Sequence, residues 1–295
     1  MLHAITFSIP EEKIIKTIPN KTKFLSNLIP GNLETYIYNT EEEYYKEYQT
    51  SFFAITCKKA GWDCMRHYEI IANGCIPYFI DIEKCPEKTM ALLPKELLIE
   101  ANKLYEKIIE KKEFQEEDKK EYQLLLTKLL NHTKKHLTTT KIAEYIIQKT
   151  KTNNAKKILF LSGDTSPDYL RCLILHGFKT THGKNCHDYP IVPHIYKSND
   201  PTAHLYGKGY TYSKITDPSL HDKERDKTIQ EDIKNKYYDI IIYGSYHRGM
   251  PYYDIISEIY SPDKIILLCG EDIHYCNELP NWIKKGHHVF LREYK

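Results

Sequence analysis

The sequence predicts an α/β protein in which a helical connector joins two Rossmann-like domains. Three observations lead to this fold class: a length of 295 residues, short apolar segments that alternate with helical patterns, and a central stretch of purely helical periodicity. At roughly 150 residues per domain, this length suits about two domains, each large enough to bury its own core. We assign residues 1–93 to the first domain, 94–150 to the connector and 151–295 to the second domain.

Composition limits the classes of partner. The 42 Lys and Arg residues nearly balance the 40 Asp and Glu residues, for a net charge of +2. A bulk positive field is therefore missing, and nucleic acid is not an expected partner. No apolar run approaches the ~20 residues of a membrane span, and the first residues hold Ser8 and early charges where a secretory signal needs an apolar core. We expect a cytoplasmic protein without a transmembrane segment.

The cysteines do not suggest a disulfide framework or a structural zinc site. None of the eight forms a CxxC pair, and we expect them to be reduced thiols: Cys57, Cys64, Cys75, Cys85, Cys172, Cys186, Cys269 and Cys276. The group His182, Cys186 and His187 has metal-ligand side chains but is expected to lie in a polar loop. We therefore expect no metal.

The connector is the clearest helical region. Pro94 opens the first helix at a position where its missing N–H has no cost. Apolar residues then recur at helical spacing in three stripes, from Leu97 to Ile109, from Tyr122 to Leu130 and from Ile142 to Ile147. The charged residues between the stripes are typical of solvated helix faces.

The second domain alternates buried strands with helices. Strands are expected at 158–162, 238–243 and 264–269, with helices at 166–177 and 251–260. Ser166 and Pro167 would begin the first of these helices, and His176 and Gly177 would end it. Because the strands are apolar on both faces, they predict a parallel sheet covered by helices.

The first domain repeats this pattern. We expect strands at Thr35–Asn39, Ser51–Thr56 and Ile76–Ile80, and a helix at Glu41–Tyr48. A second helix is expected to begin at an Asp63 cap and to run to Asn73, with Gly74 closing it.

The loop between the strand at 51–56 and the helix at 63–73 is the best candidate binding site. Ligands of parallel sheets gather beyond the carboxyl ends of the strands. Lys58, Lys59 and the N–H groups of the first helical turn would face one anion there. Arg66 and Glu69 share a helix face, so the guanidinium could clamp phosphate oxygens while the carboxylate accepts hydrogen bonds from a sugar. The alternative is a simple intrahelical ion pair.

This segment resembles the nucleotide-sugar-binding segment of exostosin-like glycosyltransferases and, more broadly, is similar to the sugar-nucleotide domain of GT-B transferases. The resemblance extends from Ser51 to Asp81 and rests on the Lys-rich loop, Gly61-Trp62-Asp63, Arg66, Glu69, Gly74-Cys75-Ile76-Pro77 and Asp81. It implies that Arg66 lies near the donor diphosphate and that Glu69 binds the ribose. His67-Tyr68 and Tyr78-Phe79 depart from the family pattern and leave the identity of the donor open.

The resemblance implies a GT-B glycosyltransferase that moves a sugar from a nucleoside-diphosphate sugar, expected to be UDP-linked, to a glycan or glycoprotein acceptor. The reaction would be inverting and metal-independent, with no cofactor besides the sugar nucleotide. Residues 1–93 would bind the donor, through Lys58, Lys59, Gly61, Trp62, Asp63, Arg66 and Glu69, and residues 151–295 would form the acceptor side.

The second domain should then supply a base for the acceptor hydroxyl. Asp164 and Asp272 each follow a predicted strand at its carboxyl end and are the two candidates; loop solvation or helix capping is the alternative for each. His247 and Arg248 are candidates for contact with the acceptor or a phosphate. Tyr210 lies in a stretch that fits a sugar-stacking loop or a turn packed by tyrosines.

Two other functions fit parts of the sequence. A non-catalytic sugar-nucleotide or glycan-binding module would retain the donor residues. A Rossmann-type methyltransferase would use the unit at 158–164, although Ser162 to Ser166 offers one glycine where a glycine-rich turn is expected. The donor signature also precedes the acceptor side, the reverse of the usual GT-B order, which suggests a circular permutation with strands at 4–8 and 288–294 near the domain junction.

Overall fold

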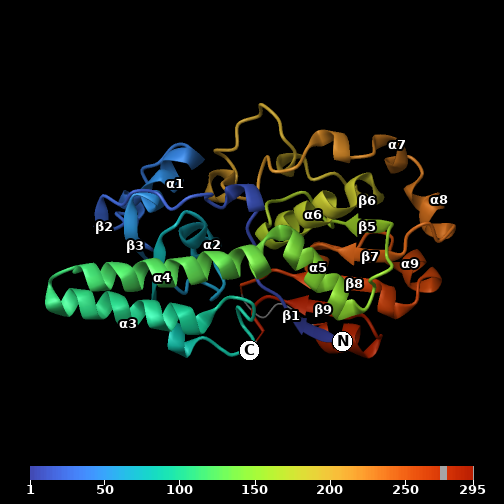
Figure 1. The fold of residues 1–295 in the computed structure, drawn as a ribbon. Helices are drawn as coiled ribbons and strands as arrows, with labels where there is room; N and C mark the ends of the chain where they lie inside the picture. Colours follow the sequence, from blue (N-terminus) through green and yellow to red (C-terminus); the bar gives the residue numbers. More distant parts are fainter. Residues whose placement is uncertain (273–277, 295) are drawn as a thin grey trace.

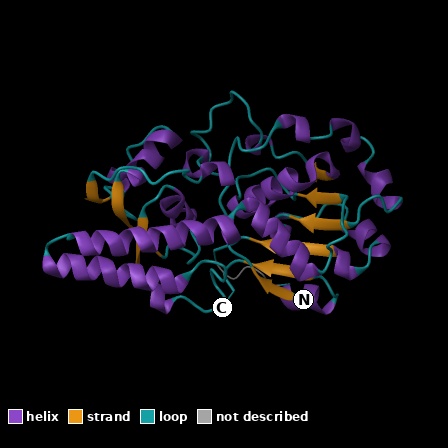
Figure 2. Cartoon of the chain, in the orientation of Figure 1, coloured by secondary structure: helices purple, strands orange, loops and turns teal. Residues whose placement is uncertain are grey.

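The computed structural model describes residues 1–272 and 278–294. It contains a six-stranded parallel sheet and a three-stranded parallel sheet, with helices packed around both (Figure 1). Figure 2 shows that helices and loops surround the strands of the larger sheet. The α/β class and the parallel sheets are confirmed.

The larger sheet has the strand order β1-β9-β8-β7-β5-β6. Its strands are β1 (Leu2–Ala4), β5 (Ile158–Leu161), β6 (Cys186–Tyr189), β7 (Ile240–Tyr243), β8 (Ile265–Cys269) and β9 (His288–Leu291). Successive side chains point to opposite faces, so Ile158 and Phe160 join one apolar cluster while Leu159 and Leu161 join another. The continuous apolar runs in the sequence follow from this burial on both faces.

Helices cover both faces of this sheet. The cluster with Phe160 includes residues of α5 (Thr139–Thr150) and α6 (Tyr169–His182). The cluster with Leu161 includes residues of α8 (Ile229–Lys234), α9 (Tyr253–Ile259) and α10 (Leu279–Lys284). A short helix, α7 (Lys223–Asp226), precedes α8.

The expected bounds of α6 are wrong at both ends. Asp168, not Ser166, is the N-cap, and its side chain accepts a hydrogen bond from the backbone N–H of Arg171. The helix also continues beyond Gly177, because this glycine serves helix packing rather than capping. A Cβ atom there would lie 2.1 Å from the backbone oxygen of Thr139, so glycine is what permits α5 and α6 to touch through their backbones.

The smaller sheet consists of β2 (Lys23–Leu25), β3 (Ser51–Cys57) and β4 (Ile76–Ile80), in that order. The expected strand at Thr35–Asn39 is wrong, since a 3₁₀ turn at Leu33–Thr35 precedes a segment without regular structure. Its aromatic residues alternate as in a strand, but their hydroxyl groups bond to helical residues: Tyr36 to Arg66 and Tyr38 to Glu47.

Five helices follow the expected stripes and turns closely. α1 (Glu41–Gln49) and α2 (Met65–Ala72) flank β3, and the connector forms α3 (Lys95–Lys111), α4 (Glu116–His132) and α5. A π-helical turn, Thr133–Leu137, separates α4 from α5. The helices expected within residues 94–150 are thus present, with α3 packed against β4 and α5 packed against α6.

The N-terminal strand belongs to the larger sheet, although the next three strands in the sequence form the smaller one. Strand β1 ends at Ala4, earlier than expected, and pairs in parallel with β9 of the larger sheet, Leu2 opposite Val289. One continuous apolar cluster also includes Phe53 of β3 and Ile158 of β5. The two sheets therefore share a core instead of having entirely separate ones.

No helix of the described residues is long and apolar enough to cross a membrane. Cys75, Cys172 and Cys186 are buried thiols without a disulfide, as expected, whereas Cys276 lies outside the described residues. Cys186 and His187 belong to β6, which corrects the expectation of a polar loop.

Candidate functional site

The carboxyl ends of the two sheets meet. In Figure 1 the strands of the larger sheet point toward the region of the smaller one, and the loop after β3 contacts the residues after β9. Glu293 accepts hydrogen bonds from the backbone N–H of Trp62 at 3.1 Å and of Asp63 at 3.0 Å. Arg292, which is almost fully buried, donates to the backbone oxygens of Asp63 and Gly270. Ligands of parallel sheets bind at such edges.

Glu293 occupies part of the anion site that the sequence predicts. Its carboxylate accepts from the loop N–H groups of Trp62 and Asp63, which directly precede the helical turn whose N–H groups were expected to face a ligand, and a Cβ atom at Gly61 would lie 2.6 Å from its Oε1. The absence of a side chain at Gly61 therefore lets an internal carboxylate, from the other sheet, approach the loop.

Asp63 does not cap α2, whose N-cap is Cys64, without a side-chain hydrogen bond. The Asp63 carboxylate instead accepts from the backbone N–H of Phe7 and from the hydroxyl of Tyr68, both at 2.8 Å. Burial raises the pKa of Asp63 to about 6, although Arg292 and these hydrogen bonds oppose the shift. The residue connects the loop to the N-terminal segment and is unavailable as a cap.

The two lysines of the loop are exposed. Lys58 lies over the ring of Trp62, with 5.7 Å from Nζ to the centroid, and Lys59 lies over the ring of Tyr36 at 5.8 Å. Arg66 contacts the same Tyr36 ring at 5.6 Å from Cζ. Lys59 and Arg66 are thus brought to one aromatic ring, while Lys58 is directed to another.

Arg66 is 8% exposed and incompletely paired. One terminal nitrogen, Nη2, donates to the Tyr36 hydroxyl, but Nη1 is inaccessible to water and has no hydrogen-bond partner among the described residues. A buried charged donor without a partner carries a large desolvation penalty. An acceptor oxygen placed beside Nη1 would remove it.

Glu69 is buried one helical turn from Arg66. Its oxygens accept from the Tyr44 hydroxyl at 2.7 Å and from the Thr211 hydroxyl at 2.5 Å. Burial raises the pKa of Glu69, and these two hydrogen bonds and the charge of Arg66 oppose the shift. Within residues 1–272 and 278–294 no ion pair joins Arg66 to Glu69, so the simple intrahelical pair is not formed.

The segment around Tyr210 covers this site from the second half of the chain. Residues Tyr206–Gly209 form a 3₁₀ turn, and Lys208 donates to the backbone oxygen of Tyr38 at 2.5 Å. The Tyr210 ring lies 5.6 Å from that of Tyr44, between centroids. Tyr210 is therefore placed beside the partners of Glu69, at the donor-side residues rather than at the edge of the larger sheet.

The two candidate bases are both bound to arginines. Asp164 Oδ1 is 3.1 Å from Nη1 of Arg171, and Asp272 Oδ1 accepts from Nη2 of Arg292. Partial burial acts to raise the pKa of Asp164, but the hydrogen bonds from Arg171 and Ser166 outweigh it and lower the pKa. A carboxylate stabilised in its ionised form is a weaker proton acceptor.

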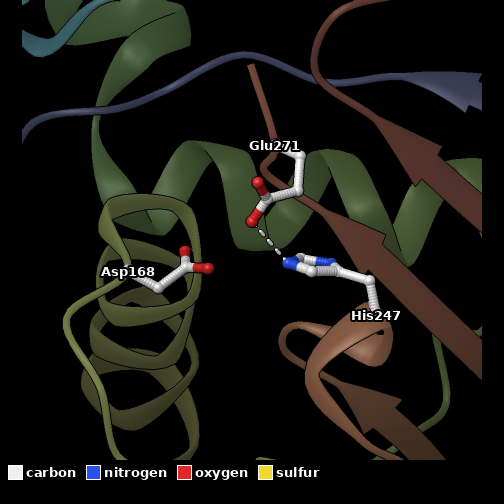
Figure 3. Close-up of side chains that lie close together, drawn as sticks. All are labelled: Asp168, His247 and Glu271. Carbon is white, nitrogen blue, oxygen red and sulfur yellow. Dashed lines mark ion pairs between the residues drawn. The ribbon is translucent and has the colours of Figure 1, made fainter. Parts of the chain in front are cut away.

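A second cluster at this edge is tighter. Asp168, His247 and Glu271 follow β5, β7 and β8, and their side chains converge on one point (Figure 3). The His247 Nε2 to Glu271 Oε1 distance is 2.6 Å. Arg248 Nη2 lies 3.6 Å from Glu271 Oε1 and 3.7 Å from Asp168 Oδ2.

Sequence reasoning named His247 and Arg248 but did not group them with Glu271 and Asp168. Two glycines, Gly163 and Gly249, allow the loops after β5 and β7 to approach each other closely. A Cβ atom at Gly163 would lie 2.4 Å from the backbone oxygen of Arg248. Glu271 was visible as a residue at the end of a strand. The signal for Asp168 was its residue type, because aspartate directly before a helical pattern is a common N-cap, and here its side chain accepts from the backbone N–H of Arg171.

Comparisons of the chain with protein-family models, curated proteins and solved structures found no match. The functional interpretation rests on the residues and their arrangement.

Proposed function

We propose that the protein is a glycosyltransferase that uses a nucleoside-diphosphate sugar, UDP-linked, as donor and a glycan or glycoprotein as acceptor, with inversion at the transferred sugar. The observation that carries the proposal is the buried guanidinium of Arg66, whose Nη1 lacks a partner among the described residues, one turn from the buried carboxylate of Glu69. This pair lies beyond the carboxyl end of β3, where parallel sheets bind ligands.

The positive charge of Arg66 and the negative charge of Glu69 would bind different parts of the sugar nucleotide. Arg66 would donate from Nη1 to a diphosphate oxygen, and the N-terminus of α2 would add its positive partial charge. Glu69 would accept from the ribose hydroxyls in place of its present donors, Tyr44 and Thr211. The leaving diphosphate would be stabilised by Arg66 rather than by a metal ion. The resemblance of Ser51–Asp81 to exostosin-like enzymes supports the same two roles.

The acceptor would bind between the two carboxyl edges. The convergence of both edges at Glu293 and the loop 61–63 supports a GT-B arrangement, in which one domain binds the donor and the other the acceptor. The proximity of β1 and β9 in one sheet supports the permuted domain order. At the larger sheet, Asp164 and Asp272 are both bound to arginines, which disfavours either carboxylate as the base.

The test is calorimetric binding of UDP and of inorganic pyrophosphate. Arg66→Ala should weaken both ligands about 100-fold, since a charge-assisted hydrogen bond in a buried site is lost. Glu69→Gln should weaken UDP about tenfold and leave pyrophosphate unchanged, because Glu69 would contact only the ribose. Arg225→Ala, which alters a partly exposed arginine on α7, is the matched control and should bind as the unmodified protein.

A thermal unfolding curve for each variant separates lost binding from lost folding, and Arg66→Lys provides a second, charge-conserving variant. Failure of the unmodified protein to bind any nucleoside diphosphate or its sugar conjugates would refute the proposal. Binding without slow donor hydrolysis or transfer to any glycan would support the non-catalytic module instead.

A further inference from the structure

Three ligand-type side chains from three separate elements converge at the carboxyl edge of the larger sheet. Asp168 caps α6, His247 lies in the 3₁₀ turn after β7, and Glu271 follows β8. One oxygen or nitrogen atom of each lies within 4.8 Å of the others. Figure 3 shows all three directed toward a common point. Ligands about 2.1 Å from one metal ion are separated by distances of this range.

His247 has the contacts of a ligand rather than of a hydrogen-bonded imidazole. Both of its ring nitrogens are inaccessible to water and have no hydrogen-bond partner among the described residues. Nε2 nevertheless lies 2.6 Å from Glu271 Oε1. A proton on Nε2 is therefore not directed at the carboxylate, and two lone-pair atoms so close repel each other unless a cation lies between them.

Two hydrogen bonds hold the carboxylate of Asp168 beside His247 and Glu271. The residue is 8% exposed, its Oδ1 accepts from the backbone N–H of Arg171 at 2.9 Å, and its Oδ2 accepts from the Ser245 hydroxyl at 2.7 Å. Each carboxylate oxygen can accept a further interaction. Such outer contacts orient a carboxylate and are the usual support of a metal ligand.

The guanidinium of Arg248 lies beside the three side chains and already offsets some of their negative charge. Its distances to Asp168 and Glu271, 3.7 and 3.6 Å, exceed those of a hydrogen bond, and its side chain is 26% exposed. The guanidinium also donates from Nη1 to the backbone oxygen of Pro167 at 3.3 Å, a long hydrogen bond that it would give up by turning outward. It would compete with a bound cation rather than exclude one.

We propose that Asp168, His247 and Glu271 bind a divalent transition-metal ion of the Zn²⁺ or Mn²⁺ type. One imidazole and two carboxylates suit ions of intermediate hardness better than Ca²⁺ or Mg²⁺, which favour all-oxygen sites. Three protein ligands leave positions for water or a substrate hydroxyl, whose pKa the ion would lower. The site is separate from Arg66, so the ion would act on the acceptor side and would not replace Arg66 at the donor diphosphate.

The test uses the full chain without an affinity tag, stripped of metal with a chelator and then titrated with Zn²⁺, Mn²⁺ and Mg²⁺ in a calorimeter. One Zn²⁺ or Mn²⁺ per chain should bind, with Mg²⁺ weaker. His247→Phe and Glu271→Gln should each weaken the ion roughly tenfold or more, and Co²⁺ added to the unmodified protein should show the absorption bands of a nitrogen–oxygen site.

Three further variants make the result specific. Arg248→Gln removes the competing cation and should tighten binding severalfold. His204→Gln and Glu258→Gln change exposed residues of the same types and should have no effect. Equal affinity in His247→Phe, Glu271→Gln and the unmodified protein, or no stoichiometric ion at all, would overturn the proposal. Because Arg66→Ala should leave metal binding intact, failure of this site and failure of the donor site give different results.

Discussion

At the carboxyl edge of the smaller sheet, a guanidinium nitrogen of Arg66 lacks a hydrogen-bond partner among the described residues, whereas at the edge of the larger sheet the imidazole of His247 lies between two carboxylates. The first edge presents a positive group to an anion, and the second presents acceptors to a cation. Although both edges belong to parallel sheets, their residues determine opposite ligand chemistries. Architecture positions a site, and side chains decide what it binds.

The two edges also differ in how they are supported. Asp168 at the larger edge is held by Ser245 and Arg171 of the same sheet region. At the smaller edge, Glu69 is held by Thr211, and the loop N–H groups are held by Glu293, both from the second half of the chain. The donor-side edge therefore depends on the other region, while the larger edge is largely self-supporting.

The largest effect should come from breaking that dependence. Glu293→Ala removes the acceptor of two loop N–H groups and one partner of buried Arg292, and should lower the free energy of unfolding by about 3 kcal/mol. UDP binding should weaken and metal binding should not. Urea unfolding and calorimetry measure both, with exposed Glu258→Ala as the control. If metal binding were lost instead of UDP binding, the dependence would run the other way.

The second effect is on acid stability, through His67 of the donor-side helix α2. This imidazole is fully buried between Thr56 and the backbone oxygen of Trp62, and burial lowers its pKa to about 3. The unfolded chain binds a proton near pH 6.5 that the folded chain excludes. The contribution of His67 to stability is thus fully present above pH 6.5 and falls by about 1.4 kcal/mol per unit below it, or about 2 kcal/mol at pH 5.

His67→Gln should reduce the slope between pH 6.5 and 5 by about 1.4 kcal/mol per unit, whatever its cost at pH 8, while His194 and His288, whose pKa values burial lowers to about 4, keep their own contributions. Urea unfolding at three pH values measures the difference from the unmodified protein. His204→Gln, at an exposed position, should keep the slope. An unchanged slope in His67→Gln would mean that other buried groups determine the acid sensitivity.

A smaller effect is expected from removing either of the two hydroxyl groups that donate hydrogen bonds to Glu69. Tyr44→Phe removes the donor from α1, and Thr211→Val removes the donor from the second half of the chain. Each should cost about 1.5 kcal/mol of unfolding free energy, since a hydrogen bond to a buried carboxylate is lost. Thermal or urea unfolding measures both. A cost at Thr211 close to zero would show that the smaller edge needs no support from the larger region.

The smallest effect is expected at the loop lysines. Lys59→Ala should change UDP affinity by less than about threefold, because an exposed charge near a ligand contributes little. Lys58→Ala should behave in the same way. Calorimetry at low and high salt measures the change. A loss of tenfold or more would place the lysines in direct contact with the donor, as their positions in the sequence predict.

The sequence was sufficient for elements whose pattern is local. Buried strands such as Ile265–Cys269 and the three connector helices follow from apolar periodicity alone. It was insufficient where tertiary contacts decide. Thr35–Asn39 alternates like a strand, but its tyrosines bond to helices, and Gly177 resembles a helix end until α5 is placed against it.

The candidate site divides in the same way. The positions of Arg66 and Glu69 on one helix face follow from their spacing. The carboxylate of Glu293 at the Trp62 and Asp63 N–H groups comes from 230 residues away and leaves no local signal. The grouping of Asp168 with His247 and Glu271 similarly requires the strand order, which the sequence does not specify.

The chain passes between the two sheet regions at two places that are tied together. One is the N-terminal segment after β1, and the other is the π-helical turn between α4 and α5. They pair where Ile9 donates to the backbone oxygen of Leu137 and accepts from the N–H of Thr139. Because the two crossings are hydrogen-bonded to each other at Ile9, neither can shift without straining the other. The link between the two sheet regions at this point is therefore a pair of joined chain segments rather than two independent ones.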